Sequence, residues 1–556
     1  MPSRTRAAFA VGAAALVAVL LVSVAWWPAA QKPSPHAAPS PTADSHVLVP
    51  SPTPSPAAPS PAPSASPAAA PGLAWGPSAA EWEAALETAR TLPLADAAGQ
   101  VIVASVASPS PTATEDLVAD LGLGGVIVMA DAVTDAAGVR ELADAAQAGA
   151  ARSGTRDWGA LVGVDQEGGV VSRLRGVMPD LPSFMAAGAA SDKAAVRAAY
   201  AQAAVDMRAM GFTVDFAPVA DATVGLADPT IRSRSAGSDS ARVSATVGAA
   251  VGGFLDGGVV PVVKHFPGHG SVTEDSHEEL PVQRSSLSDL EERDMVPFVS
   301  AIDAGAPAVM MAHIALPEWG DGPASLEPAA YAYLRDVLGF DGVAMTDALN
   351  MGAVKATHGS GQAAVDALAA GADLLLMPPD PREARDAIVA AVEDGDVPRE
   401  RLDEAAARMI LLARWQQGLE PVADEGLDYA RQLAAAGTTV AARDCSAAFV
   451  GDTVTITGGW EADRAALAAA LAEHGVTVGD GGTRVLLMGG DDARGSADVV
   501  VAMGGPWGLG SSEAEVYVGL YGRGAGALAG LADVLVGAAE PLGEWPVDVD
   551  VPHGTC

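Results

Sequence analysis

The chain has 556 residues, of which 49% are hydrophobic, and it carries a formal net charge of −37. This length accommodates two or three domains, or one large barrel with a further domain, and the apolar content suffices for a sizeable core. Because so negative a surface repels phosphate backbones, we expect no nucleic-acid partner.

Only two cysteines are present, Cys445 and Cys556. They are too few for a disulfide framework or for a cysteine-based metal site. One disulfide is arithmetically possible, but Cys556 is the last residue and chain ends are commonly mobile. We therefore expect these two cysteines to remain unpaired.

Residues 1–30 have the pattern of an export signal. Arg4 and Arg6 precede an apolar run from Ala7 to Trp27, as the basic and hydrophobic regions of such a signal do. The run is long for a cleaved signal and nearly long enough to span a bilayer. A signal peptide and an N-terminal membrane anchor are both open, and either predicts an extracellular or cell-surface protein.

Residues 31–72 are dominated by Pro, Ala and Ser. This composition cannot bury a core and favours an extended, semi-rigid chain. We interpret the segment as a disordered linker that holds the next domain away from a membrane or through a cell wall.

From residue 73 to 418, short apolar runs alternate with Ala-rich amphipathic stretches such as 194–210 and 363–370. Strands alternating with helices indicate parallel βαβ units. Eight such units predict an α/β fold, a TIM-like (β/α)8 barrel, with a doubly wound open sheet as the competing fold. The predicted strands are Val101–Ser105, Gly125–Met129, Ala160–Val164, Thr213–Phe216, Val259–Lys264, Ala308–Ala312, Gly342–Thr346 and Asp373–Met377.

A connecting segment, 419–445, leads to a smaller C-terminal α/β domain at 446–556. Its predicted elements are strands at Thr453–Thr457, Arg484–Met488 and Asp498–Ala502, a helix at Arg464–His474 and a Gly-rich loop at Gly504–Ser512.

Polar residues follow several of the predicted barrel strands. Asp165 follows the third strand, Lys264 and His265 end the fifth, His313 follows the sixth and Asp347 the seventh. Active sites of parallel barrels form at the C-terminal ends of the strands. Any single Asp is equally well explained as a helix cap or turn residue, but the whole set predicts one polar pocket.

The loop after the fifth strand is the densest polar feature. Gly268 and Gly270 permit a sharp turn near a ligand, and Asp275 and His277 follow, two residues apart. A carboxylate beside an imidazole orients the ring and adjusts its pKa toward neutrality, which suits a group that donates a proton and later takes one back. The alternative is a surface loop with an incidental histidine.

Asp347 has two compatible interpretations. A carboxylate at a strand end can attack C1 of a sugar and form a covalent glycosyl-enzyme. It can also cap a helix that begins near Ala348. Metal or cofactor chemistry is disfavoured, because a Pro-Gly pair separates His265 from His269 and the barrel region has no His-Glu-x-x-His or Gly-x-Gly-x-x-Gly motif.

In order and spacing, a set of these segments resembles the family 3 glycoside hydrolases, specifically their β-N-acetylhexosaminidase (β-N-acetylglucosaminidase) branch. The resemblance runs from about residue 95 to 415 and is carried by residues 163–169 with Arg173, 181–183, 216–221, 234–237, 264–270, 275–277 and 346–349.

The resemblance implies a retaining reaction through a covalent intermediate, with no metal ion. It implies Asp347 as the nucleophile and His277 as the general acid/base, with Asp275 as its partner. The residues that it implies for binding the sugar are Asp165, Arg173, Arg234, Lys264 and His265, with His313 near the pocket.

The implied function is exo-acting removal of β-linked N-acetylglucosamine from cell-wall or chitin-type oligosaccharides, by a monomer. A β-glucosidase, a β-xylosidase and an N-acetylglucosaminide phosphorylase of the same family are alternatives, and so is an inactive carbohydrate-binding wall protein. The Asp-Ser-His run argues against the glucosidase and xylosidase, and the presence of both Asp347 and His277 argues against an inactive protein.

Two residues depart from the family pattern: Arg232 and Ala236 stand where Gly and Phe are usual, on either side of Arg234. We expect the local wall of the sugar pocket to differ there. The C-terminal region resembles, more loosely, the family's α/β sandwich domain. That domain supplies the acid/base carboxylate in β-glucosidase relatives, a role that we do not expect here.

Overall fold

The structure, a computed structural model, describes residues 72–556 apart from 153, 155, 423–425, 427, 446 and 447. The predicted export signal at 1–30 and the predicted linker up to residue 71 lie outside the described residues. Within the described part of the chain, no helix is both long and apolar enough to cross a membrane.

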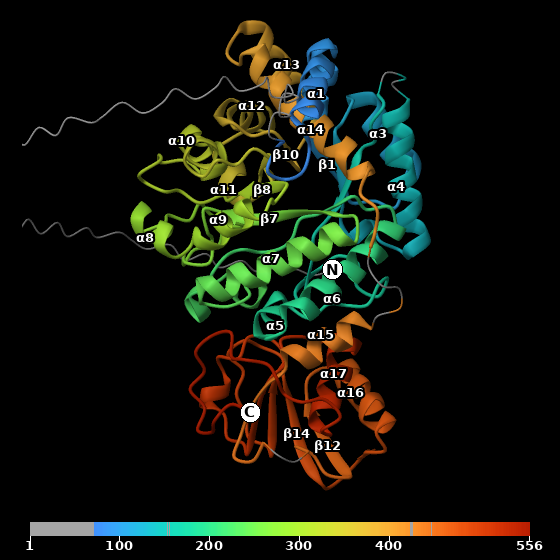
Figure 1. Ribbon diagram of the computed structural model, residues 1–556, viewed down its shortest axis with the longest axis vertical. Helices are drawn as coiled ribbons and strands as arrows, with labels where there is room; N and C mark the ends of the chain where they lie inside the picture. Colours follow the sequence, from blue (N-terminus) through green and yellow to red (C-terminus); the bar gives the residue numbers. More distant parts are fainter. Residues whose placement is uncertain (1–71, 153, 155, 423–425, 427, 446–447) are drawn as a thin grey trace, which may run out of the picture. The chain divides into compact units, whose positions relative to one another are not determined.

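Eight parallel strands form the predicted barrel (Figure 1). Their order is β10-β1-β2-β3-β6-β7-β8-β9, and a parallel bridge from Met345 in β9 to Leu374 beside β10 brings the two ends of the sheet together. All eight predicted strands are present, so the predicted barrel is confirmed. The strands are Ile102–Val106 (β1), Gly125–Val128 (β2), Leu161–Val164 (β3), Val214–Asp215 (β6), Val260–Phe266 (β7), Ala308–Met311 (β8), Val343–Thr346 (β9) and Leu375–Leu376 (β10).

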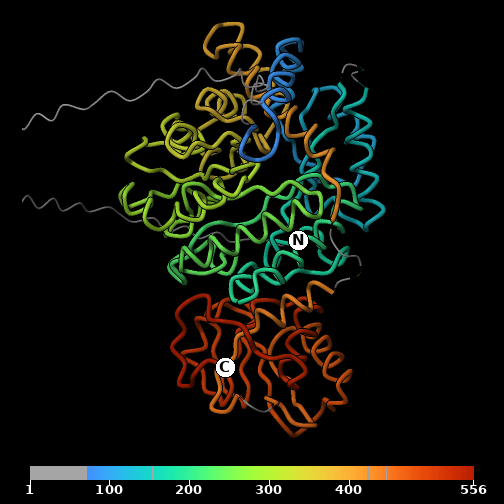
Figure 2. The backbone as a smooth tube through the Cα atoms, in the orientation of Figure 1, coloured from blue at the N-terminus to red at the C-terminus, as the bar shows by residue number. Residues whose placement is uncertain are grey.

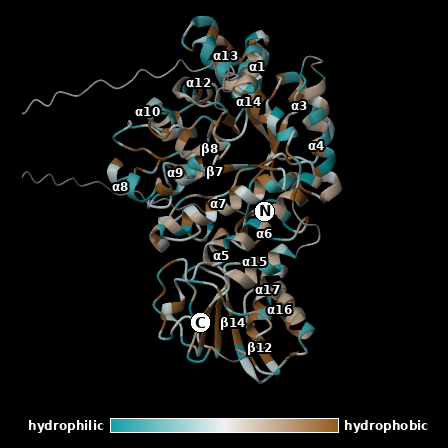
Figure 3. Ribbon diagram, viewed as in Figure 1, coloured by the Kyte–Doolittle hydropathy of each residue, from teal (hydrophilic) through white to brown (hydrophobic). Residues whose placement is uncertain are grey.

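The barrel strands are apolar on both faces because helices cover their outer side. Val, Leu and Met residues of β2, β3, β8 and β9 are buried without alternation, and the strands are mostly brown in the hydropathy colouring of Figure 3. The surrounding helices are α1 (Ala79–Thr91), α2 (Leu94–Gln100), α3 (Pro111–Leu121), α4 (Ala136–Ala151), α5 (Phe184–Ala189), α6 (Lys193–Ala209), α7 (Ser240–Asp256), α8 (Leu287–Glu292), α9 (Val296–Asp303), α10 (Pro328–Ala332), α11 (Gly352–Lys355), α12 (Ser360–Ala370), α13 (Pro381–Asp394) and α14 (Arg399–Gln417).

Several helix starts are fixed by an aspartate directly before the first turn. The side chains of Asp135, Asp192, Asp239 and Asp380 accept backbone N–H groups at the starts of α4, α6, α7 and α13. Such caps satisfy donors that have no partner inside the helix.

A short antiparallel hairpin, absent from the sequence-based prediction, follows β3 directly. It consists of β4 (Gln166–Gly168) and β5 (Val171–Ser172). Gly168 and Gly169 adopt φ values of 94° and 59° at its turn, a region that favours glycine. The hairpin folds the residues after Asp165 back over the end of the barrel.

The C-terminal region contains a second sheet, with the order β11-β16-β15-β14-β12-β13. Figure 2 traces the chain from the barrel, which runs from blue to orange, into this darker orange and red region. All pairings in this sheet are parallel except that of β11 with β16. The elements are α15 (Tyr429–Gly437), β11 (Thr439–Ala442), β12 (Thr453–Gly458), α16 (Glu461–Glu473), β13 (Thr477–Val478), β14 (Thr483–Met488), β15 (Val499–Ala502), β16 (Val516–Gly519) and α17 (Ala525–Leu535).

The predicted strands β12, β14 and β15 and helix α16 are present, whereas β11, β13 and β16 were not predicted. Strand β11 lies inside 419–445, the segment predicted to be a connection, and supplies an edge of the second sheet. The division of the chain at residues 418 and 446 remains a prediction.

The expectation that the cysteines are unpaired was wrong. Cys445 and Cys556 form a disulfide with Cα atoms 5.4 Å apart. The tail is not free, because the backbone N–H of Cys556 donates to the Val440 carbonyl at 2.8 Å and Thr555 bridges to Ala441. These bonds hold the end of the chain against β11 and bring the two sulfurs together.

Candidate active site

One polar pocket of about 430 Å³ lies at the C-terminal ends of the barrel strands. The predicted residues that line it are Asp165, Arg173, Arg234, Lys264, His265, His277 and Asp347. Asp275 and His313 are not among the lining residues, but each hydrogen-bonds one that is. The structure therefore gathers the predicted site residues into one place.

Asp347 follows β9 directly and is 9% exposed. Its Oδ1 accepts the N–H of Ala348 at 2.7 Å. Burial alone would raise the pKa of Asp347, but His313, His265 and this N–H group outweigh it and lower the pKa below its usual value. Helix α11 begins only at Gly352, so Asp347 is no helix cap and its carboxylate is available for chemistry.

His313 follows β8 and is fully buried. Its Nδ1 contacts the Ser325 hydroxyl at 2.6 Å and its Nε2 contacts the Ala348 carbonyl at 3.0 Å. Both ring nitrogens are thus used by the protein. His313 fixes the backbone beside Asp347 and does not line the pocket.

His277 lies on the long loop between β7 and α8, with its side chain 58% exposed. Asp275 Oδ1 accepts both the His277 backbone N–H at 2.9 Å and a hydrogen bond from Nδ1 at 2.8 Å. Burial would raise the pKa of Asp275, but these bonds from His277 lower it, so the carboxylate stays ionised. With Nδ1 engaged, Nε2 is the ring atom left for proton exchange.

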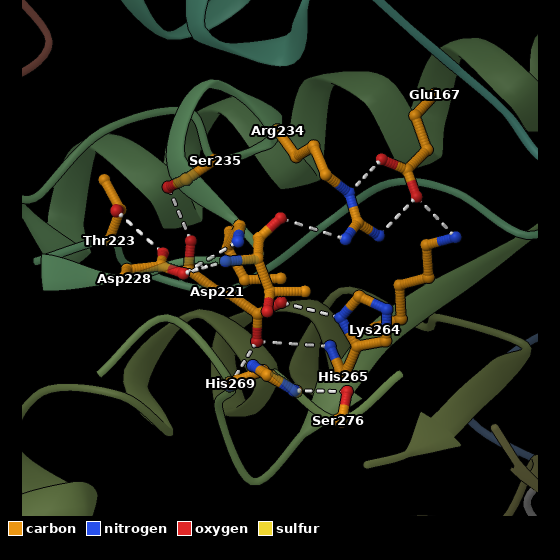
Figure 4. Close-up of polar contacts among 12 residues, drawn as sticks. Glu167, Asp221, Thr223, Asp228, Arg234, Ser235, Lys264, His265, His269 and Ser276 are labelled. Atoms are coloured by element: carbon orange, nitrogen blue, oxygen red, sulfur yellow. Dashed lines mark hydrogen bonds and ion pairs between the residues drawn. The ribbon is translucent and has the colours of Figure 1, made fainter. Parts of the chain in front are cut away.

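The loop that carries His277 is held by hydrogen bonds on two sides. His269 Nε2 and the Ser276 hydroxyl are 2.8 Å apart and buried (Figure 4). Burial lowers the pKa of His269 to about 4, so this imidazole is neutral. On the other side, the N–H groups of Gly352 and Ala353 donate to the carbonyls of His277 and Ser276, each at 3.2 Å.

Gly352 is required where the His277 loop meets the segment after Asp347. A Cβ at this position would lie 2.5 Å from the His277 carbonyl oxygen and 2.6 Å from that of Glu278. No side chain fits there, so close backbone contact joins the two loops.

A buried ion cluster forms the floor of the pocket. Glu167, 3% exposed, receives two 2.8 Å hydrogen bonds from the Arg234 guanidinium and one of 2.7 Å from Lys264 Nζ (Figure 4). Lys264 also donates to Asp165 at 3.0 Å. Burial opposes ionisation of Glu167, but Arg234 and Lys264 hold its pKa well below the usual range.

Glu167 lies within residues 163–169, one of the segments that carry the family resemblance, but it was not predicted as a site residue. In a straight extension of β3 it would point to the same side as Asp165. The β4–β5 hairpin instead places it between two cations from separate loops. The signal that could have found it is the excess of Arg and Lys over carboxylates among the predicted sugar-binding residues.

Asp221 is a second residue whose role was missed. It is fully buried, and its Oδ2 lies 2.7 Å from His265 Nδ1 (Figure 4). Its Oδ1 accepts the backbone N–H groups of His265 at 3.3 Å and His269 at 2.7 Å. The β7–β8 register shifts between Lys264 and Phe266, and such irregularities re-aim side chains, so Lys264 and His265 both face the pocket.

Arg173 lines the pocket, and one N–H group of its guanidinium has no hydrogen-bond partner among the described residues. This group is Nε–H, which is buried. A buried guanidinium N–H without a partner is costly.

Asp215, at the end of β6, is buried below this cluster. Its Oδ1 accepts the Gln166 N–H at 2.9 Å, whereas its Oδ2 has no partner among the described residues. Burial raises the pKa of Asp215 to about 8, so the group is mostly protonated at neutral pH. It supports the hairpin without adding a charge.

A barrel with a polar pocket at the carboxyl ends of its strands is the architecture of an enzyme. Residues 94–412, more than half of the chain, match the family model described as the glycosyl hydrolase family 3 N terminal domain. The chain therefore belongs to glycosyl hydrolase family 3, and the predicted family is confirmed.

Relatives of known name support the predicted branch of the family. Beta-hexosaminidase LpqI of Mycobacterium tuberculosis is 37% identical over 258 residues, which are 45% of this chain and 66% of that protein. A beta-hexosaminidase of Xylella fastidiosa is 35% identical over 285 residues, 50% of this chain and 83% of the relative. The chain thus spans slightly less than two thirds of the mycobacterial protein.

A solved structure resembles most of the described chain. It is described as a glycoside hydrolase family 3 beta-N-acetylglucosaminidase from Paenibacillus sp. str. FPU-7. It matches with a TM-score of 0.72 and 26% identity, over 82% of this chain and 99% of that one. The likeness therefore extends beyond the barrel into the C-terminal region.

We predict that Asp215→Asn stabilises the protein at neutral pH. The folded-state pKa of about 8 exceeds the unfolded value of about 3.9. Between these values the unfolded chain releases a proton that the folded protein keeps, so wild-type stability falls as pH rises. Asn avoids this loss, and we expect a gain on the order of 2 kcal/mol at pH 7.

The measurement is urea unfolding of both proteins from pH 4 to pH 8. The gain should shrink toward pH 4, where the aspartate of the unfolded chain also begins to be protonated. A difference that does not vary with pH would show that the Asp215 carboxyl does not stay neutral on folding.

Proposed function

We propose that the protein is a retaining, exo-acting β-N-acetylglucosaminidase. The single observation that carries this proposal is that Asp347 and His277, from two different loops, line one sugar-sized pocket. Ionised Asp347 suits a nucleophile, and an imidazole with Nδ1 held by Asp275 suits a proton carrier at Nε2. The names of the relatives support the N-acetylhexosaminide as substrate class.

In the first step, a carboxylate oxygen of Asp347 attacks C1 of the sugar. The bond from C1 to the leaving oxygen breaks, and His277 Nε2–H gives its proton to that oxygen. In the second step, water attacks C1, gives a proton to Nε2 and releases Asp347. Two inversions at C1 retain the configuration.

The remaining pocket residues bind the sugar in this proposal. Asp165, Lys264 and His265 present oxygen and nitrogen atoms to its hydroxyls, while Arg173 and Arg234 supply guanidinium donors. Because Glu167 and Asp221 already hold Arg234, Lys264 and His265, these groups need little rearrangement when the substrate binds.

We further propose cell-wall or chitin-type oligosaccharides as substrates, encountered outside the cell by a monomeric enzyme. The export-signal pattern at residues 1–30 and the Pro/Ala/Ser-rich segment at 31–72 support this location. The domain boundaries at 73–418 and 446–556 belong to the same proposal.

Asp347→Asn should lower kcat on an aryl N-acetyl-β-glucosaminide by on the order of 10³-fold or more, because the amide cannot form the glycosyl-enzyme. A mechanism-based fluoro sugar that keeps the N-acetyl group should label Asp347 in the wild-type protein, as read by mass spectrometry of its peptides. Asp341→Asn, just before the amino end of the same strand, is the matched control and should retain activity. Label on another residue would contradict the assignment.

His277→Ala should slow hydrolysis of substrates with poor leaving groups by about 10²- to 10³-fold and of activated aryl glycosides much less, because proton donation matters most for a basic leaving oxygen. The comparison is kcat/KM across a series of leaving groups. His474→Ala removes another Asp-paired histidine, 2.8 Å from Asp533 and outside the pocket, and should leave the series unchanged. Equal losses across the series would argue against an acid role.

Water is the acceptor that we propose. Inorganic phosphate added to the assay should leave the rate and the free-sugar product unchanged. Accumulation of N-acetylglucosamine 1-phosphate would instead identify a phosphorylase. The same assay with aryl glucosides and xylosides should give little turnover.

A further inference from the structure

The loop between β6 and α7, residues 216–239, supplies one wall of the pocket. From this β6–α7 loop, Thr230, Ile231 and Arg234 line the cavity. Apart from a 3-10 turn at Gly225–Ala227 and another at Arg232–Arg234, the loop has no regular structure of its own. Its shape must therefore come from specific contacts.

Asp228 accepts hydrogen bonds from several residues of the β6–α7 loop. It is fully buried, and its two oxygens accept the N–H groups of Thr230, Ile231 and Arg232 at 2.8–2.9 Å. It also accepts the Thr223 hydroxyl at 2.9 Å (Figure 4). These bonds make the stretch from 223 to 232 a single unit, so a displacement at one end is transmitted to the pocket wall.

The C-terminal region touches this unit at two points. The Trp507 indole packs on Gly225, where a Cβ would lie 3.0 Å from Nε1. An oxygen of Asp491 lies 3.5 Å from the Arg232 guanidinium, and its other oxygen accepts the Gly505 N–H at 2.6 Å. Neither Trp507 nor Asp491 is among the residues that line the pocket.

The indole that meets Gly225 is itself held in place. Trp507 packs against a buried apolar cluster drawn from both the barrel and the C-terminal region, formed by Met185, Ala186, Ala189, Tyr521 and Val547. A side chain packed in this way has a fixed position, so it limits the movement of the turn at Gly225.

We propose that the C-terminal region positions the sugar-binding wall: Trp507 and Asp491 hold the β6–α7 loop, and Asp228 passes this constraint on to Thr230 and Ile231. Trp507 and Asp491 are positioning residues, since they act through the loop and not on the substrate. The inference rests on the proposed function in that it takes the wall to bind the N-acetylhexosaminide.

The test is steady-state kinetics of full-length variants on an aryl N-acetyl-β-glucosaminide. Trp507→Ala should raise KM by about 5-fold and leave kcat within about 2-fold, because a loosened wall weakens ground-state and transition-state binding alike. Trp507→Phe should restore most of the affinity. Asp491→Asn should raise KM in the same direction but less, and it decides the question if Trp507→Ala does not fold.

Glu544→Gln is the matched control. Glu544 pairs with Arg242 at 2.9 Å, another contact between the C-terminal region and the barrel, but Arg242 lies on α7 and does not line the pocket. Its KM should equal that of the wild type. A KM rise in Glu544→Gln as large as in Trp507→Ala, or no rise in either Trp507→Ala or Asp491→Asn, would overturn the proposal.

Hydrogen–deuterium exchange separates this inference from the proposed function. Peptides covering residues 222–235 should exchange faster in Trp507→Ala and Asp491→Asn than in the wild type or Glu544→Gln. This readout needs no turnover. A wild-type protein without glycosidase activity would defeat the proposed function, whereas unchanged exchange in both variants would defeat the positioning role.

Discussion

The arrangement of the pocket depends on one buried carboxylate shared by two cations. Glu167 binds Arg234 and Lys264 at 2.7–2.8 Å, and these three residues come from the hairpin after β3, the β6–α7 loop and β7. Removing one partner from such a cluster leaves an uncompensated buried charge, which is strongly destabilising. The cluster therefore fixes how three separate segments meet, and it sets the positions of the groups that we propose bind the sugar.

The sequence was most informative where a residue's position follows from topology. Once eight apolar runs are read as parallel strands, Lys264, His265 and Asp347 must lie at the same end of the barrel. Asp275 and His277 are two residues apart, so their contact needs only a local turn. These inferences depend on short-range pattern and on the closure of the barrel.

Contacts between distant segments were not predictable in the same way. The Asp221–His265 pair spans 44 residues and the disulfide spans 111, and no periodicity links such partners. Strand β11 directly follows the Ala-rich helix α15, so its four residues carry too little contrast to be recognised. The role of Glu167 depends on a hairpin whose turn is set by two glycines, a feature that alternation alone does not reveal.

Asp347 and His277, the proposed nucleophile and proton carrier, are linked through backbone hydrogen bonds. The N–H of Gly352, five residues after Asp347, donates to the carbonyl of His277. On the far side, neutral His269 holds Ser276 and is itself tied by its backbone N–H to Asp221. The loop that carries the exposed His277 is therefore held on both sides by segments of the barrel.

The bond between Cys445 and Cys556 has a consequence for where the protein can reach its complete form. Thiols persist in the reducing cytosol, whereas disulfides form and last in oxidising compartments. A newly made chain held in the cytosol would have its C-terminal residues secured against β11 by backbone hydrogen bonds and apolar packing, without the covalent bond. If the protein is exported as proposed, covalent closure of that sheet edge would follow its transfer to an oxidising compartment.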